Sequence, residues 1–164
     1  MNLIVAVAKD WGIGCENKLL FRISEDQKYF RATTTGKVVV MGHNTFKSLP
    51  GGKPLKDRVN VVLSKDSSLV IPNVIVCNSI DDLCQKLKNY DENDIFIIGG
   101  AVIYKELLNR CKKAYITKID AMLDADTFFP NIDEIPDWKL VSETAQKKSD
   151  ALMYKFCVYE KEGS

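Results

Sequence analysis

The stretch Lys37-Val38-Val39-Val40-Met41-Gly42-His43-Asn44-Thr45 (37–45) decides the fold: an apolar run ends in a glycine, and a helical pattern follows at once. Short continuous Val and Ile runs are typical of parallel strands that are covered on both faces. The same order of strand, glycine and helix returns at residues 95–104, around Gly99-Gly100. The two turns predict a parallel sheet with helix N-termini gathered along one edge.

Further apolar runs predict the other elements of an α/β fold. We expect strands at 3–8, 37–41, 59–63, 74–77 and 95–98, and helices at 25–34, 44–48, 80–89 and 102–109. Later strands are expected at 114–119, 139–143 and 152–159, and the polar turn 146–150 predicts that the last two form an antiparallel hairpin at a sheet edge. Ser24-x-x-Gln27 is a capping-box pattern for the first helix, and Ser79-x-x-Asp82 is a looser cap for the third.

The composition excludes several classes of function. A chain of 164 residues with 46% hydrophobic residues is long enough for one domain with its own core. A net charge of +1 leaves no basic field for nucleic acid or an anionic membrane surface. Five cysteines without paired spacing indicate free thiols in a reducing cytoplasm, and the single histidine lies in no metal-ligand cluster, so no metal is expected.

Asp26 is the candidate catalytic acid. It falls in the first turn of a helix, where an acid can simply offset the helix dipole. It also shares one helix face with Gln27 and Phe30, and a carboxylate beside an inward-facing aromatic is more often functional. Burial raises the pKa of such a group while the dipole lowers it, and we expect burial to dominate.

Several other segments could bind anionic groups. The turns at Gly42 and Gly99-Gly100 could hold a pyrophosphate, although each could also be a tight connection. Neither turn matches the G-x-G-x-x-G fingerprint or the P-loop. Ser64-Lys65 could bind a further phosphate or could be a solvated strand end. Arg58 and Lys53 could clamp a carboxylate or could be an exposed pair of cations.

Taken in order, these segments resemble dihydrofolate reductase over the whole chain. The matching residues are Ile-Val-Ala-Val-Ala (4–8), Asp10-x-x-Ile13-Gly14, Asp26, Phe30, Met41-Gly42-x-x-Thr45, Leu55-x-x-Arg58, Leu63-Ser64, Ile98-Gly99-Gly100, Tyr104, Thr117-x-Ile119-Asp120 and Asp126-Thr127-x-Phe129-Pro130. No single motif is decisive, but the ordered set is highly specific.

The resemblance implies a single α/β domain spanning 1–164. It would hold an eight-stranded mixed, mostly parallel sheet flanked by four helices, with an antiparallel C-terminal hairpin and an adenosine-binding lobe at about 37–89. It implies NADPH-dependent reduction of 7,8-dihydrofolate to tetrahydrofolate, serving one-carbon metabolism and thymidylate and purine synthesis. A cytoplasmic monomer that binds dihydrofolate and antifolate inhibitors is expected, as are a lid at 10–23 and a cis peptide bond at Gly99-Gly100.

The resemblance also implies a role for individual residues. Asp26 would bind the pterin, Thr117 would bond to Asp26, and Phe21 and Leu19, which belong to the lid, would complete the catalytic group. The expected substrate-binding residues are Ile4, Ala6, Asp26, Gln27, Phe30, Leu49, Lys53, Leu55, Arg58, Ile98 and Thr117. The expected cofactor-binding residues are Ala6, Ile13, Gly14, Asn17, Leu19, Gly42, His43, Asn44, Thr45, Leu63, Ser64, Lys65, Ile98, Gly99, Gly100, Ala101, Val102, Ile103, Tyr104 and Thr127.

The chain departs from the family pattern at a few positions. Leu20-Phe21 replaces the usual Pro-Trp, Gln27 stands where an apolar residue is usual and could bond to Ser24 instead of ligand, and His43 replaces a common arginine. A third glycine after Gly99-Gly100 is also missing. Two alternatives remain: the riboflavin-pathway reductase of the same fold, and a non-catalytic NADPH-binding module. The combination of Asp26, Thr117 and Arg58 favours a pterin with a glutamate tail over both.

Overall fold

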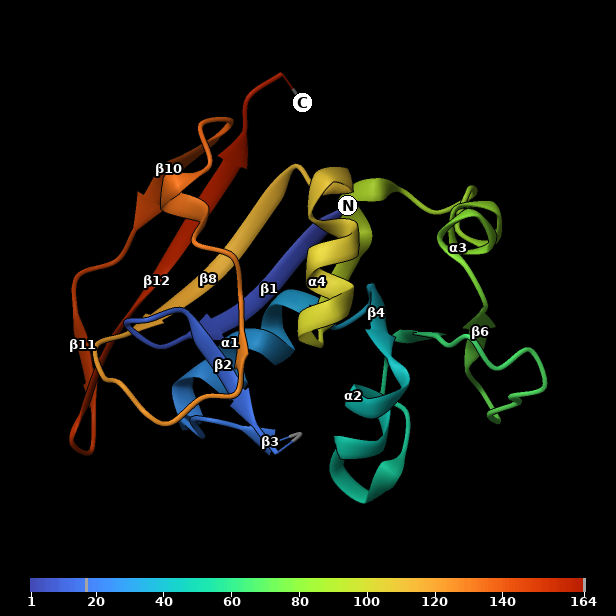
Figure 1. Cartoon of the computed structure of the whole chain (residues 1–164), viewed down its shortest axis with the longest axis horizontal. Coiled ribbons are helices and arrows are strands. Elements are labelled where there is room, and N and C mark those ends of the chain that lie inside the picture. Colours follow the sequence, from blue (N-terminus) through green and yellow to red (C-terminus); the bar gives the residue numbers. More distant parts are fainter. Residues whose placement is uncertain (17, 164) are drawn as a thin grey trace.

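The main sheet of this computed structural model, which describes residues 1–16 and 18–163, is mixed and mostly parallel, as predicted (Figure 1). Within these residues its strand order is β10-β12-β8-β1-β7-β4-β5-β6, and a ninth strand, β11, pairs with β12. The pairs from β8 to β6 are parallel, whereas β12 is antiparallel to β8, β10 and β11. The strands are β1 (Asn2–Val7), β4 (Val38–Gly42), β5 (Val59–Leu63), β6 (Ile75–Cys77), β7 (Ile95–Gly99), β8 (Lys113–Ile119), β10 (Trp138–Glu143), β11 (Lys147–Ser149) and β12 (Leu152–Lys161).

Four α-helices accompany the sheet in the described part of the chain, again as predicted. They are α1 (Ser24–Thr34), α2 (His43–Ser48), α3 (Ile80–Lys86) and α4 (Ala101–Leu107). Short 3-10 turns follow at η1 (Pro50–Gly52), η2 (Glu92–Asp94), η3 (Leu108–Arg110) and η4 (Ile132–Glu134). Figure 1 shows α4 across one face of the sheet and α1 behind it. No helix among the described residues is long and apolar enough to cross a bilayer.

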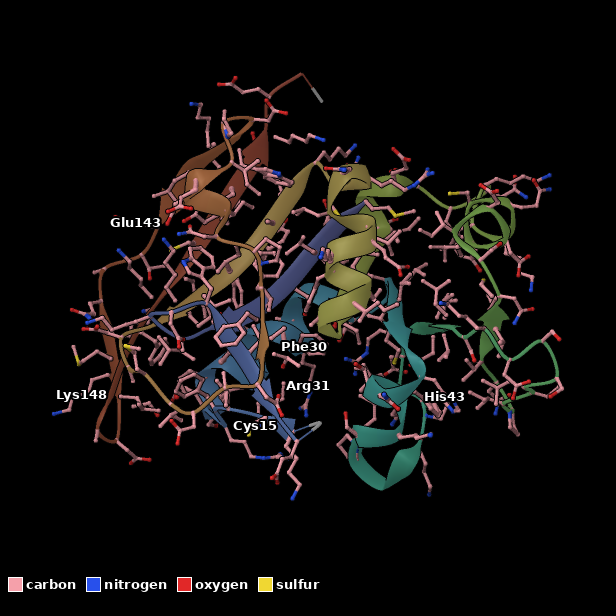
Figure 2. The ribbon with its side chains drawn as sticks, viewed as in Figure 1. Cys15, Phe30, Arg31, His43, Glu143 and Lys148 are labelled. Carbon is pink, nitrogen blue, oxygen red and sulfur yellow. The ribbon has the colours of Figure 1, made fainter. Side chains whose placement is uncertain are left out.

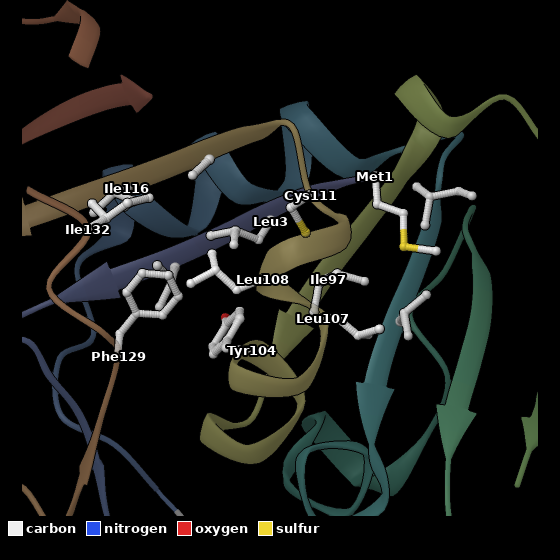
Figure 3. Packing of buried hydrophobic residues seen from close by; sticks show 14 of the residues in the cluster. Met1, Leu3, Ile97, Tyr104, Leu107, Leu108, Cys111, Ile116, Phe129 and Ile132 are labelled. Carbon is white, nitrogen blue, oxygen red and sulfur yellow. The ribbon is translucent and has the colours of Figure 1, made fainter. Parts of the chain in front are cut away.

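The strands bury both faces, which explains their continuous apolar runs. Leu3 and Val5 of β1 pack in a cluster with Tyr104 and Leu107 of α4 (Figure 3). Ala6 points to the opposite face, where it packs with a separate cluster near α1. Because successive residues of a strand alternate between faces, one strand supplies both the α4 core and the floor beneath α1.

Several helix boundaries differ from the prediction; α4, for example, ends at Leu107 and not at residue 109. Ser24 is not the N-cap of α1, because the cap is the buried Ile23 and no side chain bonds to the free N–H groups there. The helix expected at 80–89 ends at Lys86, because Leu83 and Leu87 complete its buried face and the residues that follow them are exposed. The Ser79 cap is confirmed, since its hydroxyl accepts a bond from the Asp82 N–H at 3.0 Å.

The C-terminal hairpin is confirmed, but the polar turn inside it is not. Residues 147–149 form strand β11, which pairs with 152–154, so the reversal narrows to Asp150 and Ala151. The predicted turn was too wide because β10 and β11 form an exposed edge. Most of their residues are exposed and polar, so their sequence resembles that of a loop.

A second, smaller sheet was not predicted. It consists of β2 (Gly12–Cys15), β3 (Lys18–Leu19) and β9 (Thr127–Phe128), in the order β3-β2-β9. These strands are short: β2 and β3 lie in the segment expected as a lid, and β9 lies in the matching motif Asp126-Thr127-x-Phe129-Pro130. Their pairing is non-local, since β9 follows β2 by more than a hundred residues, and local patterns carry no signal for it.

Candidate active site

Asp26 and Thr117 form the centre of the candidate site. Asp26 lies in the first turn of α1, and Thr117 lies on β8, which is the neighbour of β1 in the sheet. The Thr117 hydroxyl donates a hydrogen bond of 2.6 Å to Asp26 Oδ1, and Thr117 is only 2% exposed. Among the described residues, no Lys or Arg forms an ion pair with Asp26. The carboxylate is therefore held in place by a neutral hydroxyl.

Burial raises the pKa of Asp26 above its ordinary value, as predicted, and the bond from Thr117 opposes that rise. Removing water from a carboxylate disfavours its charged form, whereas a donated hydrogen bond favours it. The net direction is upward because the single bond compensates for only part of the lost hydration. A carboxylate with a raised pKa and one free oxygen can bind a cationic or N–H-rich ring.

The apolar walls of the site come from the face of the sheet that carries α1 and α2. Ala6 and Phe21 pack beside the buried Ile23, near Asp26. Leu49, Leu55 and Ile98 pack beside the cluster that includes Met41 and Phe46. Phe30 is half-buried on α1 (Figure 2), and Ile4 is buried on β1. The structure thus brings most of the predicted substrate-binding residues to one face.

Two predicted substrate-binding residues are less well placed. Gln27 is exposed, and its side chain makes no hydrogen bond to Ser24 or to any other described residue. Lys53 is exposed just after η1, and its ammonium forms no ion pair within the described chain. Their contact with a substrate stays a prediction.

Arg58 is held in place by two hydrogen bonds, and its remaining N–H donors are free. Its Nε donates to the Lys56 carbonyl at 2.9 Å, and its Nη1 donates to the buried Thr34 hydroxyl at 3.2 Å. Burial is the main reason that the pKa of Arg58 is lower than its ordinary value, and repulsion from Arg31 lowers it further. No carboxylate pairs with Arg58 in the described residues. A guanidinium fixed in this way can take a carboxylate from a ligand.

The two glycine turns lie side by side, as their positions in the sequence suggested. Strands β4 and β7 are parallel neighbours, with Met41 opposite Gly99. The Gly99-Gly100 peptide is cis, and a Cβ on Gly100 would lie 3.4 Å from Thr45 Oγ1. A Cβ on Gly42 would lie 3.1 Å from Ile103 Cγ1, so α4 packs closely over this turn.

The turns suit the phosphates of a dinucleotide. Neither α2 nor α4 has a side-chain cap on its first N–H groups. Uncapped N–H groups at adjacent helix starts attract anions. Asn44 and Val102 are exposed there, whereas Tyr104 is buried, with its hydroxyl bonded to the Ile4 carbonyl at 2.7 Å. Leu63, Ala101 and Ile103 complete this side of the sheet, half-buried.

Ser64 and Lys65 follow β5, directly beside the Gly42 turn. Gly42 pairs with Leu63, and the Ser64 N–H donates to the Cys77 carbonyl at 2.9 Å. Asn78 Nδ2 donates to the Ser64 carbonyl at 3.0 Å, which fixes the bend. Lys65 is exposed and has no ion-pair partner in the described structure. Its ammonium is available to an anion.

The lid hairpin is tied to β9 by a residue that the sequence analysis missed. Asp126 Oδ2 accepts a bond from the Glu16 N–H at 2.8 Å, and the Asp126 N–H donates to the Gly14 carbonyl at 2.9 Å. Thr127 pairs with Gly14, so two predicted cofactor-binding residues meet here. Asp126 belonged to a motif that matched the family, but no local pattern assigned it a partner. Ile13 lies half-buried in this hairpin, Leu19 is 71% exposed, and Asn17 lies outside the described residues.

A cavity of about 550 Å³ lies elsewhere, near Trp11 and Lys118. Its charges are already paired, with Lys118 2.9 Å from Asp133 and Lys155 3.0 Å from Glu143. A cavity lined by satisfied ion pairs is a weaker candidate than the face around Asp26. Within the described chain, no group of three His, Cys, Asp or Glu side chains could hold a metal ion.

A shielded carboxylate beside a sheet that also carries two uncapped glycine turns is typical of one class of protein: an oxidoreductase that works with a nucleotide cofactor. The family model described as dihydrofolate reductase matches residues 1–161. The chain therefore belongs to the dihydrofolate reductase family.

Relatives and a solved structure agree with this assignment. Dihydrofolate reductase of Schistosoma mansoni is 34% identical, with 98% of this chain and 95% of that protein covered. Dihydrofolate reductase of Staphylococcus aureus (strain MSSA476) is 37% identical, with 90% of this chain and 89% of that protein covered. The fold is similar to that of dihydrofolate reductase from Enterococcus faecalis complexed with NADP(H) and RAB-propyl. That comparison has a TM-score of 0.87, 28% identity, and coverage of 98% of this chain and 95% of that chain.

Proposed function

We propose that this enzyme reduces 7,8-dihydrofolate to 5,6,7,8-tetrahydrofolate with NADPH. The observation that carries the proposal is the Asp26–Thr117 pair, a shielded carboxylate that keeps one oxygen free beside an apolar face. Family membership supports the choice of reaction, and the adjacent uncapped turns at Gly42 and Gly99-Gly100 support a dinucleotide cofactor.

Asp26 orients the pterin and favours its protonated form. Its carboxylate accepts bonds from the 2-amino group and N3 of the ring, while Thr117 keeps the carboxylate rotated toward the cleft. The anion stabilises a positive charge on the ring, which raises the proton affinity of N5. Water delivers that proton, because Asp26 holds the opposite edge of the ring.

The remaining residues bind the substrate and enclose its ring. Bound NADPH supplies the hydride that reaches pterin C6. Ala6, Phe30, Leu49 and Ile98 would exclude water from the ring, and the lid that carries Leu19 and Phe21 would cover it. Arg58, assisted by Lys53, would bind the carboxylate of the glutamate tail with its free donors.

The assay that tests the proposal is the loss of NADPH absorbance on addition of dihydrofolate. The same assay with a ribosylated pyrimidine as substrate tests the riboflavin-pathway alternative. NADPH binding with no turnover of either substrate would favour a non-catalytic binding module. Inhibition by antifolates, a monomeric state, a cytoplasmic location and a role in one-carbon metabolism and in thymidylate and purine synthesis belong to the same proposal.

A further inference from the structure

Asn60 is a buried polar residue in an otherwise apolar strand. It lies in β5, whose other residues are Val59, Val61, Val62 and Leu63, and it is only 3% exposed. An amide is costly to bury unless its hydrogen bonds are satisfied, and a valine would suit a strand interior better. The reason for an asparagine at this position therefore lies outside the strand itself.

The Asn60 amide bonds to the loop that precedes its own strand, residues 53–58. Its Oδ1 accepts a bond from the Leu55 N–H at 2.9 Å. Its Nδ2 donates to the Leu55 carbonyl at 2.9 Å and to the Arg58 carbonyl at 3.2 Å. Both N–H donors of the amide are thereby used. Toward Leu55 the side chain acts as a neighbouring strand would, because it bonds to the N–H and to the carbonyl of the same residue.

The two ends of this loop are held differently. At the end nearer to β5, the Arg58 side chain donates to the Thr34 hydroxyl of α1 at 3.2 Å. The backbone of Leu55, by contrast, bonds only to Asn60 among the residues that the structure describes. Asn60 therefore decides where the first half of the loop lies relative to the second.

Asn60 and the residues that it holds lie on the substrate side of the sheet. Val62, two residues along β5, belongs to the apolar cluster that Leu55 packs against. Since residues two apart in a strand share a face, the Asn60 side chain lies on that same face. One buried amide thus fixes both an apolar wall of the site, Leu55, and the backbone of Arg58, the proposed carboxylate ligand.

We propose that Asn60 is a positioning residue for the substrate tail, which holds Leu55 and Arg58 at the spacing that a benzoyl ring followed by a glutamate requires. The inference rests on the proposed function, since it assumes that dihydrofolate is the substrate and that Arg58 binds its carboxylate. The Asn60 amide is used by the loop, so it acts through the loop and not by touching the substrate. A loop that is held in advance need not be ordered on binding, which favours affinity.

The first test replaces the amide by groups of similar size. Asn60→Asp keeps an acceptor for the Leu55 N–H, but it places an oxygen against the carbonyls of Leu55 and Arg58 where the amide places N–H groups. Asn60→Leu removes every polar atom. In both variants the KM for dihydrofolate should rise about tenfold with little change in kcat, because the lost bonds serve binding. The Kd of NADPH, measured by fluorescence, reports that each variant is folded.

The second test asks whether the loss concerns the tail of the substrate. A dihydropterin with a methyl group in place of the benzoyl-glutamate lacks the groups that Leu55 and Arg58 would contact. The preference for dihydrofolate over this compound, as a ratio of kcat/KM values, should fall about tenfold in Asn60→Asp. Arg58→Leu should also cost less affinity in the Asn60→Asp background than in the wild type, because the two changes remove the same contact.

Asn2 provides a matched control. It is also an asparagine that is 3% exposed, and its Nδ2 donates to the Asn93 carbonyl at 2.9 Å, at the start of β1. Asn2→Asp should lower stability to urea, as Asn60→Asp does, but should leave the KM for dihydrofolate unchanged. A purely structural role for Asn60 would make the two variants alike, and that result would overturn the proposal.

Amide hydrogen exchange of the wild type tests the proposal without any variant that has to fold. The Leu55 N–H should exchange slowly in the free enzyme, and added folate should change its rate little. The N–H of Lys56, which is exposed and makes no hydrogen bond within the described residues, should exchange rapidly. A Leu55 N–H that exchanges rapidly until folate is added would mean that the ligand, and not Asn60, orders the loop.

The failure of this inference differs from the failure of the proposed function. An unchanged KM for dihydrofolate in a folded Asn60→Asp enzyme would overturn the role of Asn60 and leave the proposed function intact. A wild-type protein that turns over no dihydrofolate would overturn both.

Discussion

At the scale of single residues, the enzyme depends on groups whose surroundings differ from water. Asp26 is shielded and bonded to one hydroxyl, whereas Arg58 is fixed by Thr34 and the Lys56 carbonyl with donors to spare. A shielded acid and a pre-positioned guanidinium can each do more for a ligand than the same side chains in solvent, because neither must be reorganised on binding.

Replacing Asp26 by Asn should abolish most activity at neutral pH. The amide keeps the shape but carries no negative charge, so it cannot favour a protonated pterin. We expect a loss of about 10²–10⁴-fold in the rate of hydride transfer at pH 7, as is typical for groups that control a proton. The deficit should shrink as the pH falls, because acid then protonates the substrate without help.

The wild-type rate should decrease as the pH rises, because less of the bound pterin is then protonated at N5, even though the Asp26 anion favours that form. Single-turnover pH profiles of both proteins provide the measurement. A variant with an undiminished rate at neutral pH would mean that Asp26 only stabilises the start of α1.

Replacing Arg58 by Leu should weaken dihydrofolate binding by about 1.5–3 kcal/mol, because the bonds to a carboxylate are lost. Arg58→Lys should recover only part of this, since an ammonium cannot make the two-pronged contact. The Kd of NADPH should not change in either variant. Equal folate affinity in all three proteins would remove Arg58 from the substrate site.

At the scale of elements, the segment expected to act as a lid belongs to a small sheet whose strands are far apart in the chain. β2 pairs with both β3 and β9, and Asp126 adds a bond to the Glu16 N–H beyond the ladder. The position of the expected lid therefore depends on the loop that carries Asp126. Its position should respond to changes in that loop.

Asp126→Ala should loosen the lid. The Asp126 side chain is exposed, so the lost bond contributes about 1 kcal/mol, which is roughly a fivefold change in the population of the lid held as seen here. The single-turnover rate should fall by about that factor.

Asp124→Ala is the matched control, because Asp124 is an exposed acid of the same connection that makes no side-chain hydrogen bond in the described structure. Equal rates for the two variants would show that the Asp126 bond does not hold the lid in solution.

At the scale of the whole molecule, the buried charge on Asp26, the proposed catalytic acid, opposes the stability of the fold. The pKa of Asp26 is raised in the folded protein, so the folded state binds a proton more tightly than the unfolded state does. Stability therefore decreases as the pH rises from the unfolded pKa, about 3.9, through the folded pKa, above which the full penalty applies.

Asp26→Asn should accordingly be more stable than the wild type at pH 7, because no charge is buried and the amide oxygen can still accept the Thr117 bond. The difference should disappear at about pH 3, where Asp26 is protonated in both states. Urea unfolding at the two pH values measures it. Equal stability at both would mean that the carboxylate is better solvated than its burial indicates.

Much of the fold, and the position of Asp26 in it, could be predicted from local patterns in the sequence. The runs at 37–41, 59–63 and 95–98 predicted β4, β5 and β7 to within a residue or two, because buried parallel strands are uniformly apolar. The glycines that end β4 and β7 predicted the two strand-to-helix turns, whose binding of phosphate stays a prediction. Asp26 was recognisable because an acid beside an apolar helix face is unusual. The extent of the domain, 1–164, and the lobe at 37–89 stay predictions.

Tertiary structure alone decided which distant groups meet. The bond from Thr117 to Asp26 spans 91 positions, and that from the Glu16 N–H to Asp126 spans 110. Only the complete fold brings these groups within hydrogen-bonding distance. The same holds for β11 and β9, whose exposed residues read as loops until a partner strand supplies their hydrogen bonds. Local sequence determines the elements through periodicity and turn chemistry, whereas the site arises from non-local pairing that no single stretch encodes.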